Sequence, residues 1–257
     1  MKPIADAEQK QGKSKTKFNE TNENIEWAKW TWNPVVGCKH GCPYCYARDI
    51  ATRFYGHFNP TFYPERLSAP ENTKVPDRAK TEIGYRSVFV CSMADLFGEW
   101  VPQEWIYKVI DAVRRNPQWN FLFLTKNPER YLTIEWPPNA WIGATVDRQS
   151  RVEKTIEVFK KLVNIPNIKF ISCEPLRENL HFDSKLAAVD WLIIGGWSPS
   201  TRIKIESPQW EWVQSILNEA MTTGIKVYCK PNLPDFNKHI PKMPKEYPYE
   251  KLHGCGH

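Results

Sequence analysis

The chain has 257 residues, of which 41% are hydrophobic and 25% charged, and its formal net charge is +6. This composition is typical of a globular protein and excludes a chain that is disordered throughout. The longest apolar run, residues 191–197, is far too short to cross a bilayer, so we expect no transmembrane helix. The mildly basic balance permits a nucleic-acid partner without requiring one.

Three regions follow one another along the chain. Residues 1–24 are polar and lack apolar periodicity, which predicts a flexible tail. They hold no apolar stretch of the kind that a secretion signal needs, so we expect a cytoplasmic protein. Residues 25–233 are expected to form the folded domain. Residues 234–257 are rich in proline and are expected to form an extended arm.

Short, continuous apolar runs recur through the folded domain and predict strands that are covered on both faces, as parallel strands are. These runs are residues 87–91, 120–125, 140–146, 169–173, 190–195 and 226–229. A further strand is expected to lead into Cys38.

Amphipathic patterns between the runs predict helices. The first helix spans residues 104–115, with Trp105, Val109 and Val113 on one face. Ser150 and Glu153 form a capping box that predicts the start of a second helix. Its expected apolar face is Val152, Ile156, Phe159 and Val163.

A third helix is predicted to begin at Ser207 and Pro208, which suit the N-cap and first helical positions. Gly224 suits its end. The expected apolar face is Val213, Leu217 and Met221. Strands and helices that alternate in this way predict an α/β fold of right-handed βα units, curled into a partial or full parallel (β/α) barrel. An open doubly wound sheet is the alternative.

Three of the seven cysteines, Cys38, Cys42 and Cys45, crowd together with the spacing C-x3-C-x2-C. In a reducing compartment such a cluster indicates metal binding or catalysis. A structural zinc site needs four ligands, and His40 is awkwardly placed as the fourth, two residues from both Cys38 and Cys42. A cubane iron–sulfur cluster held by three cysteines would leave one iron open to an outside ligand. The spacing alone leaves both readings open.

With Tyr44 before the third cysteine, this segment resembles the cluster loop of the radical S-adenosylmethionine (SAM) superfamily. The resemblance implies that Cys38, Cys42 and Cys45 hold a 4Fe–4S cluster whose fourth iron is chelated by SAM. It also implies a partial or full (β/α) barrel, with the loop after the first strand. The implied reaction is reductive cleavage of SAM to a 5′-deoxyadenosyl radical that abstracts hydrogen from a substrate. A flavodoxin- or ferredoxin-like electron donor is implied as a partner.

Further motifs resemble an uncharacterised, phage- and prokaryote-associated family of three-cysteine radical SAM-like proteins, over about residues 27–230. They lie at residues 30–34, 90–97, 124–128, 172–176 and 190–196. The chain departs from that family at Trp197, where an acidic residue is usual, and in its last strand, which is less aromatic.

The working groups of a parallel barrel stand at the carboxyl ends of its strands. On this basis, and on the superfamily resemblance, the candidate cofactor-binding residues are Tyr44, Ser92, Asp95, Lys126, Glu174, Gly195 and Gly196. Asp95 and Ser92 are expected to receive the amino group of SAM, with a helix N-cap as the alternative for Asp95. Lys126 would pair with the SAM carboxylate or a substrate phosphate, and Glu174 with a ribose or the substrate. The two glycines would allow close approach of the backbone.

The expected substrate is a nucleic acid or nucleotide, because the chain is basic and the family that it resembles is phage-associated. The alternative is a non-catalytic iron–sulfur or zinc module that binds nucleic acid.

For several other notable residues, the sequence favours a structural role over a functional one. Trp27, Trp30 and Trp32 are expected in the core. Cys91, Cys173 and Cys229 end predicted strands and are expected to be buried, although a redox role is open to them. His253, Cys255 and His257 are expected in a disordered tail.

Overall fold

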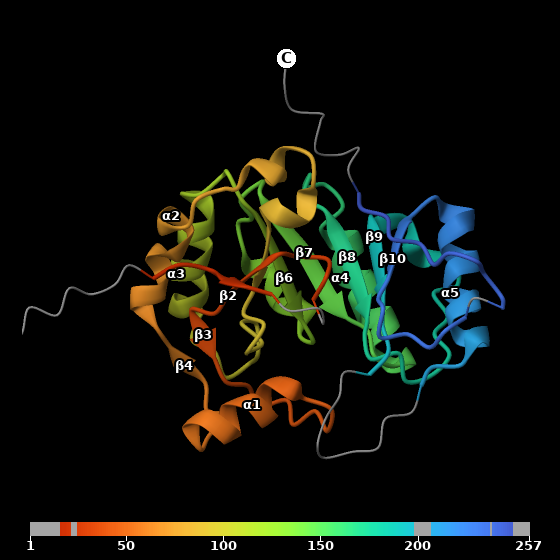
Figure 1. Ribbon diagram of the computed structural model, residues 1–257, viewed down its shortest axis with the longest axis horizontal. Coiled ribbons are helices and arrows are strands. Elements are labelled where there is room, and N and C mark those ends of the chain that lie inside the picture. Colours follow the sequence, from red (N-terminus) through yellow and green to blue (C-terminus); the bar gives the residue numbers. More distant parts are fainter. Residues whose placement is uncertain (1–15, 22–24, 198–206, 237, 249–257) are drawn as a thin grey trace, which may run out of the picture.

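Runs of β-branched and aromatic residues build one large sheet, because such side chains pack well on a pleated surface. The computed structural model describes residues 16–21, 25–197, 207–236 and 238–248. Within them, an eight-stranded sheet has the order β1-β2-β5-β6-β7-β8-β9-β10 (Figure 1). Its strands are β1 (Asn19–Glu20), β2 (Trp30–Trp32), β5 (Ser87–Val90), β6 (Asn120–Thr125), β7 (Ala140–Thr145), β8 (Lys169–Cys173), β9 (Trp191–Ile194) and β10 (Lys226–Cys229).

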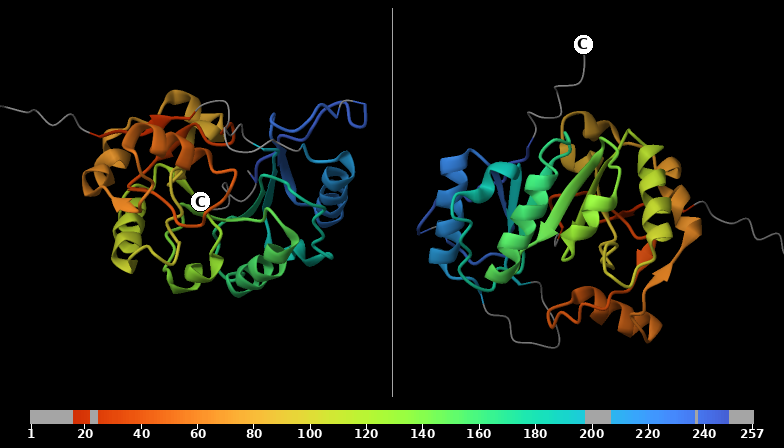
Figure 2. Two further views of the ribbon diagram at one scale, coloured as in Figure 1. Left: turned by 90° about the horizontal axis from the view of Figure 1, so that it is seen from below. Right: turned by 180° about the vertical axis from the view of Figure 1, so that it is seen from behind.

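From β2 to β10 the strands run parallel and their spatial order follows the chain, while β1 pairs with β2 in the antiparallel sense. Each crossover therefore moves one place in the same direction. The long helices α3 (Gln103–Arg114), α4 (Val152–Lys161) and α5 (Trp210–Thr223) all lie outside the curved sheet (Figure 2). This confirms the parallel α/β fold in its partial-barrel form. The doubly wound alternative is wrong, because it needs helices on both faces and a reversal of strand order.

The alternation of side chains along each strand divides the core into two parts. Val88 and Val90 face the helices and pack in one cluster with residues such as Ile106 of α3. Phe89, between them, faces the inside of the barrel. There it joins an aromatic floor made of Trp27, Phe89, Trp141, Phe170, Trp191 and Tyr228. The floor closes one end of the barrel with apolar side chains.

Gly143 of β7 is required by this floor. A Cβ atom at that position would lie 2.2 Å from the ring of Phe170, so only glycine allows the ring to pack across the strand. Trp191 meets Trp27 and Trp141 edge to face, with ring centroids 6.3 and 5.9 Å apart. Such aromatic pairs stabilise the packing beyond the area that they bury.

The remaining elements join the first two parallel strands. Two short strands, β3 (Val35–Val36) and β4 (Thr61–Phe62), form a separate antiparallel pair. Between them lie the cysteine segment and helix α1 (Tyr46–Tyr55), and the one-turn helix α2 (Ala69–Asn72) follows β4. No helix of the described residues is both long and apolar enough to span a membrane.

The predicted strands agree with the observed ones to within one residue at each end, but two helix starts are wrong. Ser150 lies in a 3-10 turn that runs into α4, so it has the helical backbone that a capping residue must avoid. Helix α5 begins after Gln209 rather than at Ser207, and no side chain caps it. Gly224 does end α5, in the left-handed conformation with φ +70°.

Two residues expected on apolar faces are exposed. Val163 lies beyond the end of α4 at Lys161 and is 57% exposed. Met221 is 73% exposed, in the last turn of α5. The other predicted apolar residues of these two helices are buried.

The described parts of the predicted tail and the predicted carboxyl-terminal arm are more packed than expected. Within the predicted tail, Phe18 is buried, with its ring 5.2 Å from that of Trp119, and β1 extends the sheet. The described part of the carboxyl-terminal arm is not extended throughout: it turns where the His239 and Ile240 amides both donate to Phe236, and it then runs along β10. The Cys229 amide donates to Pro244, and the Glu246 amide donates to Val227. The predicted tail residues His253, Cys255 and His257 lie outside the described residues.

Candidate functional site

Above the aromatic floor, the inward side chains of the barrel become polar and surround a cavity of about 610 Å³. Successive strands contribute residues from their carboxyl ends, the end of a parallel barrel that carries function. These residues are Thr125, Lys126, Thr145, Ser172, Glu174 and Lys230. The cysteine segment and α1 border the cavity on the opposite side.

Cys38, Cys42 and Cys45 all line this cavity, and all three are half-buried. The Cys45 thiol sits at the start of α1 and accepts the Arg48 amide at 3.4 Å. The Cys38 thiol accepts a backbone hydrogen bond from His40. Burial raises the pKa of Cys38 to about 12, and it also raises the pKa of Cys45. Both thiols therefore hold their protons at neutral pH until a metal displaces them.

The entry to this segment depends on Gly37, whose φ of +98° strains any other residue. A Cβ atom there would also lie 2.2 Å from the Asn59 carbonyl oxygen. The loop is thus held against the chain that returns after α1.

The donor set fits a soft metal centre better than a closed four-ligand site. Thiolates suit iron–sulfur clusters and zinc, and backbone N–H groups directed at sulfur stabilise the thiolate form. Among the described residues, no three side chains of His, Cys, Asp or Glu are preassembled at metal-binding spacing. His40, the candidate fourth ligand, instead bonds through Nε2 to Asp95 at 2.7 Å. The three thiols therefore line one cavity without being at metal-binding spacing, and their role as metal ligands stays a prediction.

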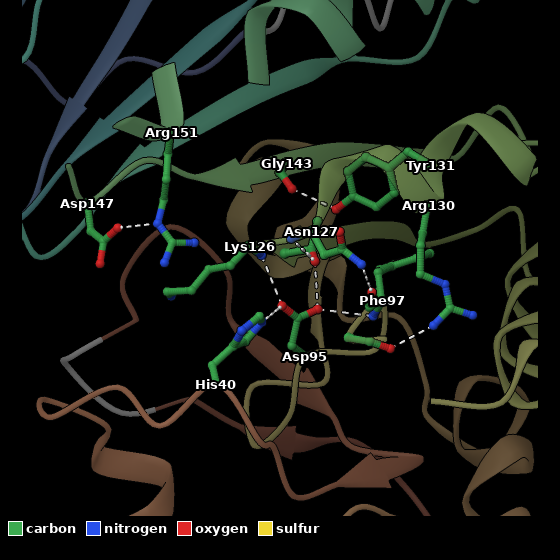
Figure 3. Close-up of polar contacts among 12 residues, drawn as sticks. His40, Asp95, Phe97, Lys126, Asn127, Arg130, Tyr131, Gly143, Asp147 and Arg151 are labelled. Carbon is green, nitrogen blue, oxygen red and sulfur yellow. Dashed lines mark hydrogen bonds and ion pairs between the residues drawn. The ribbon is translucent and has the colours of Figure 1, made fainter. Parts of the chain in front are cut away.

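Asp95 is buried at the centre of a bonded network that ties the cysteine loop to the end of β6 (Figure 3). Besides His40, it accepts from the Thr125 hydroxyl at 2.7 Å, the Lys126 amide at 2.9 Å and the Phe97 amide at 3.0 Å. Burial alone would raise the pKa of this carboxyl, but the bond from His40 and the further hydrogen bonds lower it. No helix begins at Asp95, so the N-cap alternative is wrong.

Asp95 therefore has no free lone pair directed at the cavity. Its predicted contact with the amino group of SAM stays a prediction. To make that contact, Asp95 would have to give up one of its present hydrogen bonds. Ser92 is similarly engaged, with its hydroxyl 2.6 Å from that of Thr31 and 3.2 Å from Asn33 Oδ1. Both residues nevertheless line the cavity.

Tyr44 is fixed at the rim of the cavity by its hydroxyl, which donates to the buried carboxylate of Asp147. Asp147 in turn forms an ion pair with Arg151 at 2.8 Å. The Tyr44 ring meets Trp197 edge to face, with centroids 5.4 Å apart. In Figure 3 the Lys126 side chain extends toward the space between His40 and the Asp147–Arg151 pair.

Glu174 forms an ion pair with Lys230, whose side chain is only 3% exposed. Asn232 donates to the same carboxylate at 3.1 Å. The sequence analysis missed Lys230 and Asn232, although a lysine directly after a predicted strand was a signal for them. A buried ion pair costs desolvation energy, so its presence in a cavity wall favours a functional role.

The two glycines after β9 do not line the cavity. A Cβ atom at Gly195 would lie 3.0 Å from Glu174 and 3.1 Å from Lys230, so this glycine makes room for the ion pair. The backbone of Gly196 exchanges two hydrogen bonds with the Asn232 amide group. Their predicted contact with a cofactor stays a prediction.

Cys91, Cys173 and Cys229 are buried, as expected. Cys173 and Cys229 pack in the core between sheet and helices, on the face of the sheet away from the cavity, whereas Cys91 lines the cavity. Core packing is confirmed for Trp27 and Trp32, which are buried, and Trp30 packs against the core while half-buried.

Comparison with known proteins gives a family and a fold. The family described as "Protein of unknown function (DUF5131)" matches residues 22–243. No curated protein matches the chain. A cysteine-to-alanine variant of spore photoproduct lyase with a dinucleoside spore photoproduct has a similar structure, with a TM-score of 0.55. A tyrosine-to-phenylalanine variant of the same lyase gives 0.52. Each similarity has 10% sequence identity and covers 81% of this chain and 78% of the other.

Proposed function

The chain belongs to the DUF5131 family, and we propose that it is a radical SAM enzyme with a nucleic acid or nucleotide as its substrate. The observation that carries the proposal is the position of the three cysteines. They line the cavity at the carboxyl ends of a parallel partial barrel, and His40, the candidate fourth ligand of a closed site, is bonded to Asp95 instead. Support comes from the fold shared with spore photoproduct lyase, itself a radical SAM enzyme.

Cys38, Cys42 and Cys45 would hold a 4Fe–4S cluster, and SAM would occupy the cavity beside it. When bound, the cluster supplies the electron that cleaves SAM to a 5′-deoxyadenosyl radical. The electron must come from a reductant, for which we propose a flavodoxin- or ferredoxin-like protein.

The chain's own residues position and protect this chemistry. Asp95 holds His40 and thereby fixes the loop between Cys38 and Cys42. The aromatic floor closes the inner end of the cavity, which keeps water away from a reactive species. Glu174 and Ser92 offer acceptors to the ribose and amino groups of SAM, and Lys126 offers a half-buried ammonium to a phosphate of the substrate.

The test is metal analysis of anaerobically purified full-length protein, followed by titration with SAM. A radical SAM enzyme contains about four iron and four sulfide per chain, and its cluster spectrum changes when SAM is added. Cys42→Ala should lose the iron. Cys229→Ala is the matched control, because Cys229 packs in the core on the other face of the sheet and should leave the iron content unchanged.

A non-catalytic module is the second candidate, favoured by the basic charge of the chain and by a thiol set that also suits zinc. It predicts zinc, or a cluster whose spectrum does not respond to SAM. It also predicts no 5′-deoxyadenosine after reduction.

A further inference from the structure

Two cations lie over the ring of Tyr44, a residue that lines the cavity. Lys126 Nζ and the guanidinium carbon of Arg177 each lie 5.7 Å from the centroid of that ring. Arg177 also lies 5.4 Å from the centroid of Trp197. Neither cation forms an ion pair with a carboxylate of the described residues, although both are half-buried.

The nearby carboxylates are already committed. Asp147 is buried and bonded to Tyr44, Arg151 and, at 3.7 Å, Arg148. Glu178, next to Arg177 in the chain, accepts the backbone amide of Gln149. Among the described residues here, the four cations Lys126, Arg148, Arg151 and Arg177 outnumber the two carboxylates Asp147 and Glu178, so the rim carries an excess of positive charge. A half-buried cation without a partner is stabilised when an anion binds.

The combination of aromatic rings, a guanidinium plane and unpaired cations matches the chemistry of a nucleotide. Bases stack on Trp, Tyr and Arg side chains, and phosphates pair with Lys and Arg. A stacked base in a duplex cannot enter a concave cavity, whereas a single strand or an extruded nucleotide can. An acidic peptide would use the charges but not the rings.

Resting on the proposed function, we propose that Tyr44, Lys126, Arg177 and Trp197 form a nucleotide-binding rim. The rim receives single-stranded or locally opened nucleic acid, stacks a base on Trp197 and Arg177, and pairs a neighbouring phosphate with Lys126. The target nucleotide then faces the cavity that the three cysteines line.

The test is fluorescence anisotropy of a labelled single-stranded oligonucleotide with anaerobically purified full-length protein. Stacking contributes about 1–3 kcal/mol per base, so Trp197→Ala and Arg177→Ala should each weaken binding roughly 5- to 150-fold. Trp197→Phe keeps a ring and should retain most of the affinity. The matched control is Arg78→Ala, an exposed arginine paired with Glu82 before β5, at the other end of the barrel, and it should bind as the wild type does.

Circular dichroism of each variant establishes that it is folded. A comparison of Trp197→Phe with Trp197→Ala then separates the effect of losing the aromatic ring from the effect of losing the fold. The inference is overturned if Trp197→Ala and Arg177→Ala bind like the wild type, or if polyglutamate of equal charge competes as well as the oligonucleotide. SAM cleavage by the wild type with a chemical reductant tests the proposed function separately. If SAM is not cleaved but oligonucleotide binding still depends on the rim residues, the proposed enzyme activity is refuted and the nucleotide-binding rim is supported. If SAM is cleaved but binding does not depend on the rim residues, only the rim is refuted.

Discussion

Replacement of Asp95 by asparagine should cost stability although the side chain keeps its size. Oδ1 accepts from the Phe97 amide and the Thr125 hydroxyl, and Oδ2 accepts from His40 and the Lys126 amide. An asparagine can keep only one of these oxygens. If the oxygen stays at Oδ1, the new NH2 group faces the Lys126 N–H, and that donor is left without a partner.

A buried donor without a partner costs about 1–3 kcal/mol, and the loss of a charge-assisted bond to His40 adds about 1 kcal/mol. We therefore expect Asp95→Asn to lower the free energy of unfolding by about 2–4 kcal/mol. Asp95→Ala leaves three backbone or hydroxyl donors unpaired and should cost about 3–5 kcal/mol.

The assay is urea unfolding of the full chain under reducing conditions. With a slope of about 2–3 kcal/mol per molar urea, the midpoint of Asp95→Asn should fall by roughly 1 M at an unchanged slope. The control is Asp111→Asn, which removes an exposed carboxylate paired with Arg114 and should change stability by less than about 0.5 kcal/mol. Equal midpoints for the two variants would refute the role of Asp95 as the centre of the network.

Three further results are expected. Cys42→Ala should abolish iron binding and SAM cleavage but leave the circular dichroism spectrum unchanged, because Cys42 is half-buried on a loop; cleavage that persists would refute the ligand assignment. Burial raises the pKa of Cys229 from 9.0 to about 12, so only the unfolded chain loses this proton between those values. The stability that the protonated thiol contributes is therefore present below pH 9 and falls by about 1.4 kcal/mol per pH unit above it. Urea unfolding at pH 8 and pH 10.5 should show that Cys229→Ala loses less of its free energy of unfolding between the two pH values than the wild type does. Equal losses in the two proteins would contradict the pKa shift. Gly143→Ala should lower the melting temperature because its Cβ would overlap the Phe170 ring, whereas Gly84→Ala, whose nearest contact is at 3.9 Å, should have little effect; similar losses in both would refute the packing argument.

The strands and the cysteine site were accessible from the sequence because their signals are local. A short, continuous apolar run between turn residues is typical of a buried strand. Three thiols within eight positions are close in space because the loop that carries them is short. Helix starts were less accessible. Ser150 and Ser207 both suit a cap, but the chain enters each helix at a position set by packing on the sheet rather than by the side chain.

The polar partners in the cavity depend on the fold. Glu174 and Lys230 are 56 residues apart, and their pairing follows from strand order, with β8 and β10 on either side of β9. Phe18 is a single aromatic in a polar stretch, and no periodicity marks it as buried. The role of His40 could not be predicted without the fold, because its hydrogen bond to Asp95 joins two separate loops.

The most direct test of the account is the formation of 5′-deoxyadenosine. Anaerobically purified protein, supplied with SAM and a strong chemical reductant, should release it at a rate above the background without protein, and Cys42→Ala should release none. Wild-type protein that retains a full complement of iron and sulfide yet leaves SAM intact under these conditions would contradict the account.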